Sequence, residues 1–167
     1  MILAMLTIII IILAVIIVIM FKKIPYLEAK ETVIEYQNLN KEKSLDDLIK
    51  EKAEKYGIEL RLIRAIIKVE SNFNPSAINL TDPSYGLCQV MPALAKGYGF
   101  AYDIKSLVNP DHNLNIALTF LKDLKQKYSG DLKAIIQAYN LGETKYNKGL
   151  KSPEYLEKVL YYYYKGI

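Results

Sequence analysis

The sequence predicts an all-α or nearly all-α domain that follows one N-terminal transmembrane helix. The first twenty-one residues carry no charged side chain, and in the remainder apolar residues recur at the spacing of amphipathic helices. No stretch shows a convincing strand-like alternation of apolar and polar residues. After the apolar segment, the 167-residue chain has room for one domain of about 120 residues, which can bury a core without disulfide or metal cross-links.

The segment Met1–Phe21 is dominated by Ile, Leu, Val, Met and Ala. At about 1.5 Å per residue it spans roughly 30 Å, the thickness of a hydrocarbon core. A cleavable signal peptide has a positive start, a shorter apolar run and a small-residue cleavage site, whereas this run ends in Met20-Phe21. We therefore expect an uncleaved anchor over residues 1–21, with a very apolar signal peptide as the alternative. No cysteine directly follows the run, which argues against a lipoprotein anchor.

The orientation of this anchor raises a conflict. Lys22 and Lys23 follow the span directly, and no charged side chain precedes it. The positive-inside tendency would place the C-terminal domain in the cytoplasm. The function considered below instead requires the other side of the membrane.

A stalk is predicted between the anchor and the domain. Residues 22–43 are polar and rich in lysine and glutamate, with sparse apolar residues, and we expect them to be partly helical and to hold the domain off the membrane. The globular domain is expected over residues 44–167. It begins with a capping box, with Ser44 as N-cap and Asp47 three residues on, and Gly57 is expected to end the first helix.

The next helix, from about Leu60 to Glu70, is too apolar for a surface helix and should be the central, buried one. A loop is expected from Ser71 to Ser84, because Asn-Pro and Asp-Pro pairs punctuate it. The later helices, of five to seven expected in all, begin near Pro92, Pro110, Asp131 and Pro153.

The composition excludes several kinds of site. Cys88 is the only cysteine and His112 the only histidine, so neither a thiolate metal cluster nor a His-based triad is expected. We predict no metal and no cofactor. The net charge of +4 arises from interspersed basic and acidic residues without a dense basic run, so nucleic acid is not an expected partner.

Several short motifs occur in a suggestive order. They are Glu70-Ser71, the run Phe73-Asn74-Pro75-Ser76-Ala77, the run Gly86-Leu87-Cys88-Gln89-Val90-Met91-Pro92, Ala138-Tyr139-Asn140, and Tyr155. Together they resemble the soluble-lytic-transglycosylase family, which has a lysozyme-like fold and cleaves bacterial peptidoglycan. The resemblance covers about Ser44 to Tyr164. It implies an enzyme that acts on peptidoglycan glycan strands, and together with the predicted anchor it implies a location at the cell membrane with the domain on the periplasmic or extracellular side.

Glu70 is the predicted catalytic residue. It ends an apolar helix next to a hydroxyl, a setting that can keep a carboxylate partly dry and raise its pKa. Glycoside cleavage needs an acid and usually a second carboxylate, but the motifs contain only one. The resemblance implies that one is enough: Glu70 acts first as acid and then as base for the 6-hydroxyl of the muramic acid, and a 1,6-anhydro sugar results.

The resemblance assigns further residues to the substrate site. Gln89 is suited to sugar hydroxyl and acetamido groups because its amide both donates and accepts. Tyr155 matches a family tyrosine thought to orient the glutamate, and Asn79 stands where many members carry serine. The predicted substrate-binding set is Ser71, Gln89, Met91, Tyr139, Asn140 and Tyr155.

Two alternatives remain open at this point. A hydrolysing, goose-type lysozyme would need a second carboxylate facing Glu70, for which Asp82, Asp103 and Glu143 are candidates. A catalytically silent glycan-binding or assembly protein would keep the cleft without using it. Partners in secretion or wall assembly are not identifiable from the residues.

Overall fold

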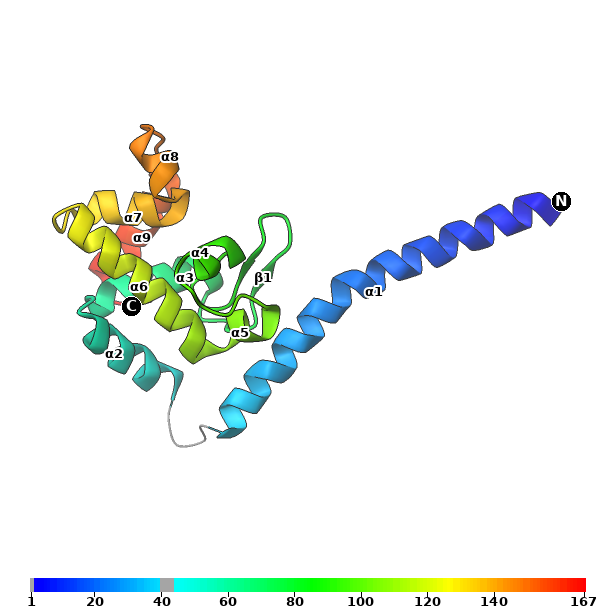
Figure 1. The fold of residues 1–167 in the computed structure, drawn as a ribbon, viewed down its shortest axis with the longest axis horizontal. Helices are drawn as coiled ribbons and strands as arrows, with labels where there is room; N and C mark the ends of the chain where they lie inside the picture. The colour runs from blue at the N-terminus through cyan, green and yellow to red at the C-terminus, as the bar shows by residue number, and fades with distance from the viewer. Residues whose placement is uncertain (1, 40–43) are drawn as a thin grey trace.

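The computed structural model describes residues 2–39 and 44–167, and these form a helical domain with one long N-terminal helix (Figure 1). The all-α prediction is confirmed. The elements in chain order are α1 (Ile2–Leu39), α2 (Leu45–Tyr56), α3 (Leu60–Ser71), β1 (Ile78–Asn79), β2 (Ser84–Tyr85), α4 (Pro92–Gly97), α5 (Ile104–Val108), α6 (Pro110–Lys127), α7 (Leu132–Leu141), α8 (Glu143–Asn147) and α9 (Pro153–Lys165).

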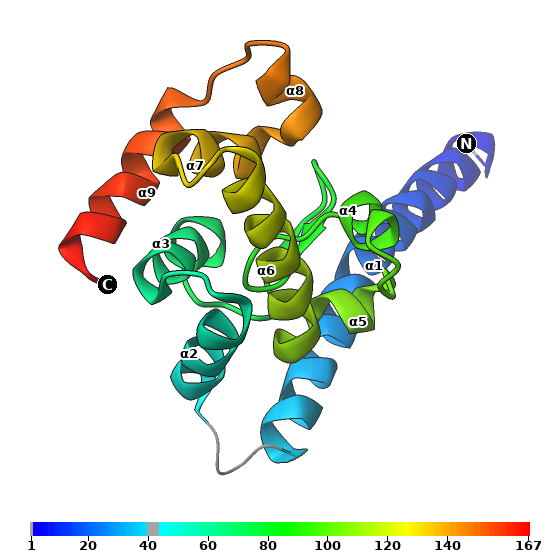
Figure 2. The same cartoon turned by 60° about the vertical axis from the view of Figure 1, so that its left-hand side comes forward.

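The core of the domain lies around α3 and α6. Helix α3 packs against α9 and α2, and α6 packs against α2, α5 and α7. Figure 2 shows α3, α7 and α9 on one side of α6, with α4 and the loop of the short strands on the other. Fully buried side chains from both central helices meet here, among them Ile63, Ile66, Ile67, Leu114, Leu118 and Leu121. Burial of such apolar surface is the main term that holds the helices together.

The predicted helix starts follow from local capping. Ser44 Oγ accepts a hydrogen bond from the backbone N–H of Asp47 at 3.1 Å, and Gly57 ends α2 in the left-handed conformation. Asn109 accepts from the N–H of His112, with Pro110 at the first position of α6. These local interactions satisfy N–H groups that lack a partner within the helix.

Two features of the fold differ from the sequence-based expectation. The predicted loop from Ser71 to Ser84 contains β1, which pairs antiparallel with β2 through Ile78 and Tyr85. Strands of two residues are too short to show an alternating pattern. The described part of the domain also has eight helices, α2–α9, rather than five to seven, because the five-residue helices α5 and α8 are shorter than the window in which a helical period can be detected.

Helix α1 runs without a break through the predicted anchor and most of the predicted stalk. Its second half lies against α5, with Ala29 and Val33 buried in the contact. Pro25 lies inside the helix, and its missing N–H accounts for a bend in α1, which is visible in Figure 1. Residues 24–39 therefore lie beside the domain. Met1 of the predicted anchor and residues 40–43 of the predicted stalk lie outside the described residues.

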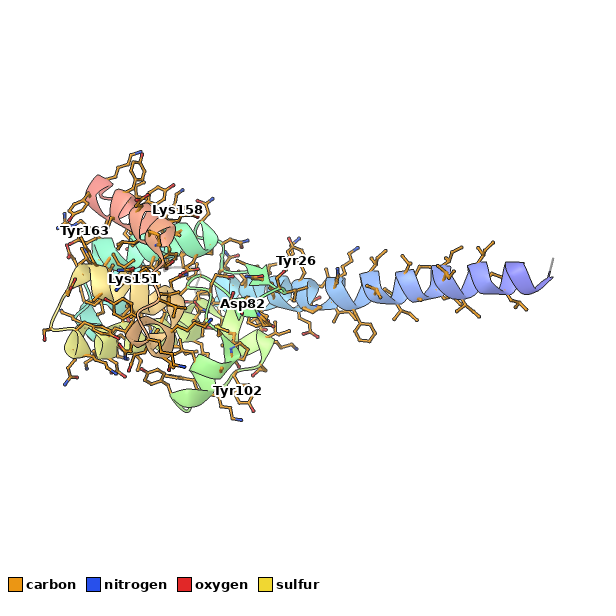
Figure 3. The ribbon with its side chains drawn as sticks, turned by 90° about the horizontal axis from the view of Figure 1, so that it is seen from above. Tyr26, Asp82, Tyr102, Lys151, Lys158 and Tyr163 are labelled. Atoms are coloured by element: carbon orange, nitrogen blue, oxygen red, sulfur yellow. The ribbon has the colours of Figure 1, made fainter. Side chains whose placement is uncertain are left out.

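The first half of α1 projects away from the domain, and its apolar side chains point outward all round the helix (Figure 3). Of the described residues, only this helix is long and apolar enough to cross a membrane. The side chains from Ile8 to Phe21 are exposed. A helix of this length and apolarity at the start of a chain is typical of a membrane span or of a signal sequence.

Candidate active site

Glu70 lies in the last turn of α3, one of the two central helices of the core. Four apolar side chains on the preceding turns, Leu62, Ile63, Ile66 and Ile67, anchor α3 in the core. Asn72 then adopts the left-handed conformation and ends the helix, with its N–H bonded to the carbonyl of Lys68. The core thus fixes the helix, and the helix end delivers the carboxylate to the edge of the core.

The carboxyl group of Glu70 is enclosed by protein on most sides but keeps one face on a pocket. Burial raises its pKa to about 7, and a hydrogen bond from Tyr155 opposes this shift. The Tyr155 hydroxyl donates to Glu70 Oε1 at 2.5 Å. A carboxyl group with a pKa near neutrality can give up a proton and accept it again at physiological pH.

Tyr139 lies on α7 beside this carboxyl group but bonds elsewhere. Its hydroxyl donates to the carbonyl oxygen of Cys88 at 2.9 Å, and its ring packs against Phe120 with a centroid distance of 5.7 Å. Burial, and then nearby Cys88 and Glu70, raise its pKa well above the usual value for tyrosine. Tyr139 is therefore a neutral hydroxyl that ties α7 to the segment that follows β2.

That segment is held by a residue that the sequence analysis did not single out. Buried Asn113 of α6 accepts from the N–H of Cys88 at 2.9 Å, and its amide donates to the carbonyls of Tyr85 and Leu107 at 2.8 and 2.7 Å. Asn113 precedes Ala117 and Leu121 at four-residue intervals, on the buried stripe of α6. The sequence signal that could have identified it is an asparagine on the apolar stripe of a helix, where a polar side chain needs hydrogen-bond partners.

Gly86 is required by the same arrangement. Its φ is +73°, and a Cβ there would lie 2.6 Å from Asn113 Nδ2 and 2.7 Å from the Leu107 carbonyl. No other residue fits without displacement of Asn113. The close approach that glycine allows here brings the backbone of residues 86–91 next to Glu70.

Gln89 connects this backbone to β2 and to the residue just before β1. It has a positive φ of 47°, and its Oε1 accepts from Ser84 Oγ at 3.0 Å. Its amide nitrogen donates to the carbonyls of Gly86 and Ala77 at 2.9 and 3.3 Å. The amide predicted to contact sugar is thus already bonded to the loop, and it also lines the pocket.

The pocket in front of Glu70 has a volume of about 500 Å³, within the usual range for small-molecule and cofactor sites. We call its two sides the helical wall (Glu70, Tyr139, Asn140) and the hairpin wall (Asn79, Asp82, Ser84, Gln89). Val90, Met91, Ala93, Leu94, Phe120, Leu141, Gly142 and Lys145 complete the lining.

Five of the seven predicted site residues line the pocket, and the other two, Ser71 and Tyr155, contribute through hydrogen bonds. Glu70, Gln89, Met91, Tyr139 and Asn140 line the pocket. Tyr155 reaches Glu70 through its hydroxyl, as described above. Ser71 donates to the carbonyl of Leu87 at 2.8 Å and so fixes the segment after β2 to the end of α3. Asn140 accepts from Ser152 Oγ at 2.7 Å, which leaves α9 with no side-chain cap from Ser152.

The three candidates for a second carboxylate lie in different places. Asp82 lines the pocket from the exposed loop between the strands. Asp103 caps α5 by accepting from the N–H of Ser106. Glu143 is paired with Lys127. Of the three, only Asp82 faces the same pocket as Glu70.

The single cysteine and the single histidine have structural positions. Cys88 is buried, and burial raises the pKa of its thiol, so it is not a nucleophile near neutral pH. The His112 ring packs edge-on against Phe100 with a centroid distance of 5.6 Å, and its Nε2 lies 2.9 Å from the carbonyl oxygen of Ala101. Neither side chain lines the pocket.

Comparison with known proteins gives consistent results. Residues 47–161 match the family model described as the Transglycosylase SLT domain. Over 109 residues the chain is 34% identical to membrane-bound lytic murein transglycosylase C of Glaesserella parasuis serovar 5, covering 57% of this chain and 30% of that protein. The protein of the same name from Yersinia enterocolitica is 35% identical over 109 residues, with the same coverage of 57% and 30%.

A solved structure shares the fold. An inactive mutant of lytic transglycosylase Slt from Pseudomonas aeruginosa superposes with a TM-score of 0.60 at 22% identity, over 69% of this chain and 22% of that one. At this identity the likeness concerns the fold alone. The chain spans about 30% of the length of the curated relatives named above.

Proposed function

Because the chain belongs to the Transglycosylase SLT domain family, we propose that it is a membrane-anchored lytic transglycosylase of peptidoglycan. Its substrate is the glycan strand, cut between N-acetylmuramic acid and N-acetylglucosamine. The observation that carries this proposal is the environment of Glu70: a carboxyl group with a pKa of about 7 on a pocket wall, bonded to Tyr155.

In the first step Glu70 is the acid. Its proton passes to the glycosidic oxygen, the bond between that oxygen and C1 of the muramic acid breaks, and the N-acetylglucosamine side leaves as an alcohol. Positive charge develops at C1, where the N-acetyl oxygen of the same sugar can stabilise it, as the family resemblance implies. Glu70 is now a carboxylate, and the Tyr155 hydroxyl, 2.5 Å from Oε1, stabilises its charge.

In the second step Glu70 is the base. It accepts the proton of the 6-hydroxyl as O6 bonds to C1, which closes a 1,6-anhydro ring and restores the protonated glutamic acid. No water is consumed and the proton count balances, so one group performs both transfers. A pKa of about 7 suits both roles because neither form is strongly disfavoured near neutral pH.

The experiment that tests this proposal compares two matched amide variants. Glu70→Gln keeps the size of the side chain but removes the proton, and we expect it to abolish release of muropeptides from purified sacculi. Asp82→Asn changes the other pocket carboxylate in the same way, and we expect it to retain most of the rate. Unchanged cleavage by Glu70→Gln would contradict the proposal.

The same pair separates the second candidate function, a goose-type hydrolase. That function is favoured only by Asp82, which lines the same pocket and could activate a water. A hydrolase predicts that Asp82→Asn is as inactive as Glu70→Gln. A silent glycan-binding protein predicts that the parent chain, like both variants, leaves the glycan uncut.

We place the catalytic domain on the outer side of the cell membrane, in the periplasm or at the cell surface. The support is the chemistry of the substrate, which belongs to the cell wall. Lys22 and Lys23 favour the opposite orientation, so the assignment needs its own test. Protease added to intact spheroplasts should digest the domain, and protection from the protease would contradict this orientation.

A further inference from the structure

The two short strands and the loop between them have side chains on two faces, one toward the pocket and one toward α1. Asn79 and Asp82 line the pocket in front of Glu70. Ile78 and Leu80 instead line a groove against α1, together with Ile19, Lys22, Lys23 and Tyr26. Successive side chains of an extended segment point to opposite sides, so a single layer of backbone separates the pocket from this groove.

The groove lies where α1 changes from apolar to polar. The uncharged run ends at Phe21, and Lys22 and Lys23 follow it. Leu80 keeps 49% and Tyr26 keeps 53% of its surface exposed. Figure 3 labels Tyr26 and Asp82 near the place where α1 leaves the domain. Lysine and tyrosine at the end of an apolar span are typical of residues at the lipid–water interface.

The contact of α1 with the domain fixes this geometry. Ala29 and Val33, one turn apart, are buried against the domain, and Tyr36 packs on the same core. Burial, Asp111 and Glu51 raise the pKa of Tyr36, which places that phenol among groups of α6 and α2. The anchor and the domain are therefore joined by a packed helix.

The distance from this contact to the membrane is short. Ala29 lies eight positions after Phe21, which corresponds to about 12 Å of helix. A bilayer of about 40–45 Å with a hydrocarbon core of about 30 Å has a headgroup layer of several ångströms on each side. The loop beside residues 19–26 thus lies at the depth of the headgroups.

We propose that the tip of this loop, at Leu80, is a membrane-contact element that rests among phospholipid headgroups beside Lys22, Lys23 and Tyr26. The pocket then opens next to the membrane surface. Given the proposed function, the substrate is glycan lying at the membrane face, within reach of a domain that cannot extend into a more distant wall layer.

The test of the membrane contact does not depend on activity. Leu80→Cys in the full chain is labelled with an environment-sensitive fluorophore and reconstituted in vesicles of phosphatidylethanolamine and phosphatidylglycerol. Tyr164→Cys, at an exposed position near the C-terminus, is the matched control, and the parent chain with buried Cys88 is the labelling blank. We expect a lipid-borne quencher near the headgroups to reduce the Leu80 signal several-fold more than the Tyr164 signal.

Two results would overturn the proposal. One is equal quenching of both labels by aqueous iodide with no effect of the lipid quencher. The other is a Leu80 signal that depends on the protein-to-lipid ratio, because a second copy of the chain would then cover the groove.

A second pair of variants tests the packed helix. Val33→Asp places a charge in the buried contact, whereas Ile34→Asp places it on the exposed side of the same turn. We expect Val33→Asp to remove the lipid quenching at Leu80 and Ile34→Asp to preserve it, with circular dichroism confirming that both remain folded. Loss of quenching in both, or in neither, would contradict a specific contact.

Activity then separates this inference from the proposed function. On glycan polymerised on lipid carriers in the same vesicles, Val33→Asp should cut several-fold more slowly than the parent, and both should cut soluble glycan fragments equally. Lipid contact without cleavage of either substrate would contradict the proposed function alone. Cleavage of both substrates at unchanged rates, without lipid contact, would contradict the inference alone.

Discussion

The two walls of the pocket are built in different ways. The helical wall is carried by α3 and α7, whose buried faces belong to the main core, and α9 supplies Tyr155 behind it. The hairpin wall is carried by two strands of two residues each and by side-chain amides that bond to backbone carbonyls. The helical wall holds Glu70, the carboxyl group that we propose as catalytic, and the hairpin wall shapes the space in front of it. Changes to the first should alter chemistry, and changes to the second should alter stability and access.

The largest expected effect is on the helical wall. Glu70→Gln should lower the rate of glycan cleavage by about 10³-fold or more, because general acid–base transfers contribute about 10²–10⁴-fold each. Release of soluble muropeptides from sacculi measures it. Thermal denaturation of the same sample is the control that the variant remains folded, and a folded variant that cleaves at the parent rate would contradict the prediction.

The same substitution, which lowers the rate of cleavage, should raise the stability of the protein at alkaline pH. Burial raises the pKa of folded Glu70 to about 7, above its unfolded value, so the folded state holds its proton more tightly. Its favourable contribution is complete below the unfolded pKa and is lost as the pH rises through about 7, a loss of about 3 kcal/mol. Glu70→Gln should remove this pH dependence and be the more stable form at alkaline pH. Urea denaturation at acid and alkaline pH measures the free energy of unfolding. If this free energy depended on pH in the same way in Glu70→Gln as in the parent, the burial of Glu70 would be contradicted.

Next to the hairpin wall, in the segment that follows β2, Gly86→Ala should mainly affect folding. The added Cβ meets Asn113 and the Leu107 carbonyl at under 3 Å, at a φ of +73°, and we expect a loss of about 2–3 kcal/mol. Gly149→Ala is the matched control, because that glycine also has positive φ but a Cβ there meets nothing within 4 Å. Equal destabilisation by both would show that backbone strain alone, rather than the contact with Asn113, explains Gly86.

Tyr155→Phe should have a smaller effect on chemistry. The Tyr155 hydrogen bond lowers the pKa of Glu70 against the effect of burial, so its removal should raise that pKa and move the pH optimum of cleavage upward. We expect a loss of about tenfold in rate at neutral pH. A pH–rate profile measures both effects. A lower rate with an unmoved profile would assign Tyr155 to packing rather than to control of Glu70.

The smallest effect is expected at Asp82, on the exposed loop of the hairpin wall. Asp82→Asn should change the rate by less than about threefold, in line with the modest effect of an exposed charge. Steady-state rates on soluble glycan at low and high salt measure it. A loss of rate comparable to that of Glu70→Gln would identify Asp82 as a catalytic residue.

The two walls also differ in how well the sequence predicts them. Helix α3 and the position of Glu70 at its end follow from an apolar run that the neighbouring turn terminates, and the caps at Ser44 and Asn109 are local signals. The hairpin wall depends on contacts between residues far apart in the chain, such as Asn113 with Cys88. Two-residue strands carry no periodicity, so their pairing could not be predicted.

The position of helix α1 was likewise not predictable from the sequence. Ala29 and Val33 are apolar positions one turn apart in a polar segment, and by themselves they are too few to predict a buried face. The segment is therefore typical of a stalk until α5 is placed beside it. The sequence supplies the helix, and the tertiary contact decides that the helix belongs to the domain.

The central claim is that Glu70 alone performs both proton transfers, without water as a reactant. The most direct test is digestion of sacculi by the full chain in water enriched in the heavy oxygen isotope, followed by mass spectrometry of the products. We expect muropeptides that end in 1,6-anhydro-N-acetylmuramic acid and carry no heavy oxygen, and none of these products with Glu70→Gln. Reducing ends that carry one heavy oxygen would contradict this claim and indicate a hydrolase.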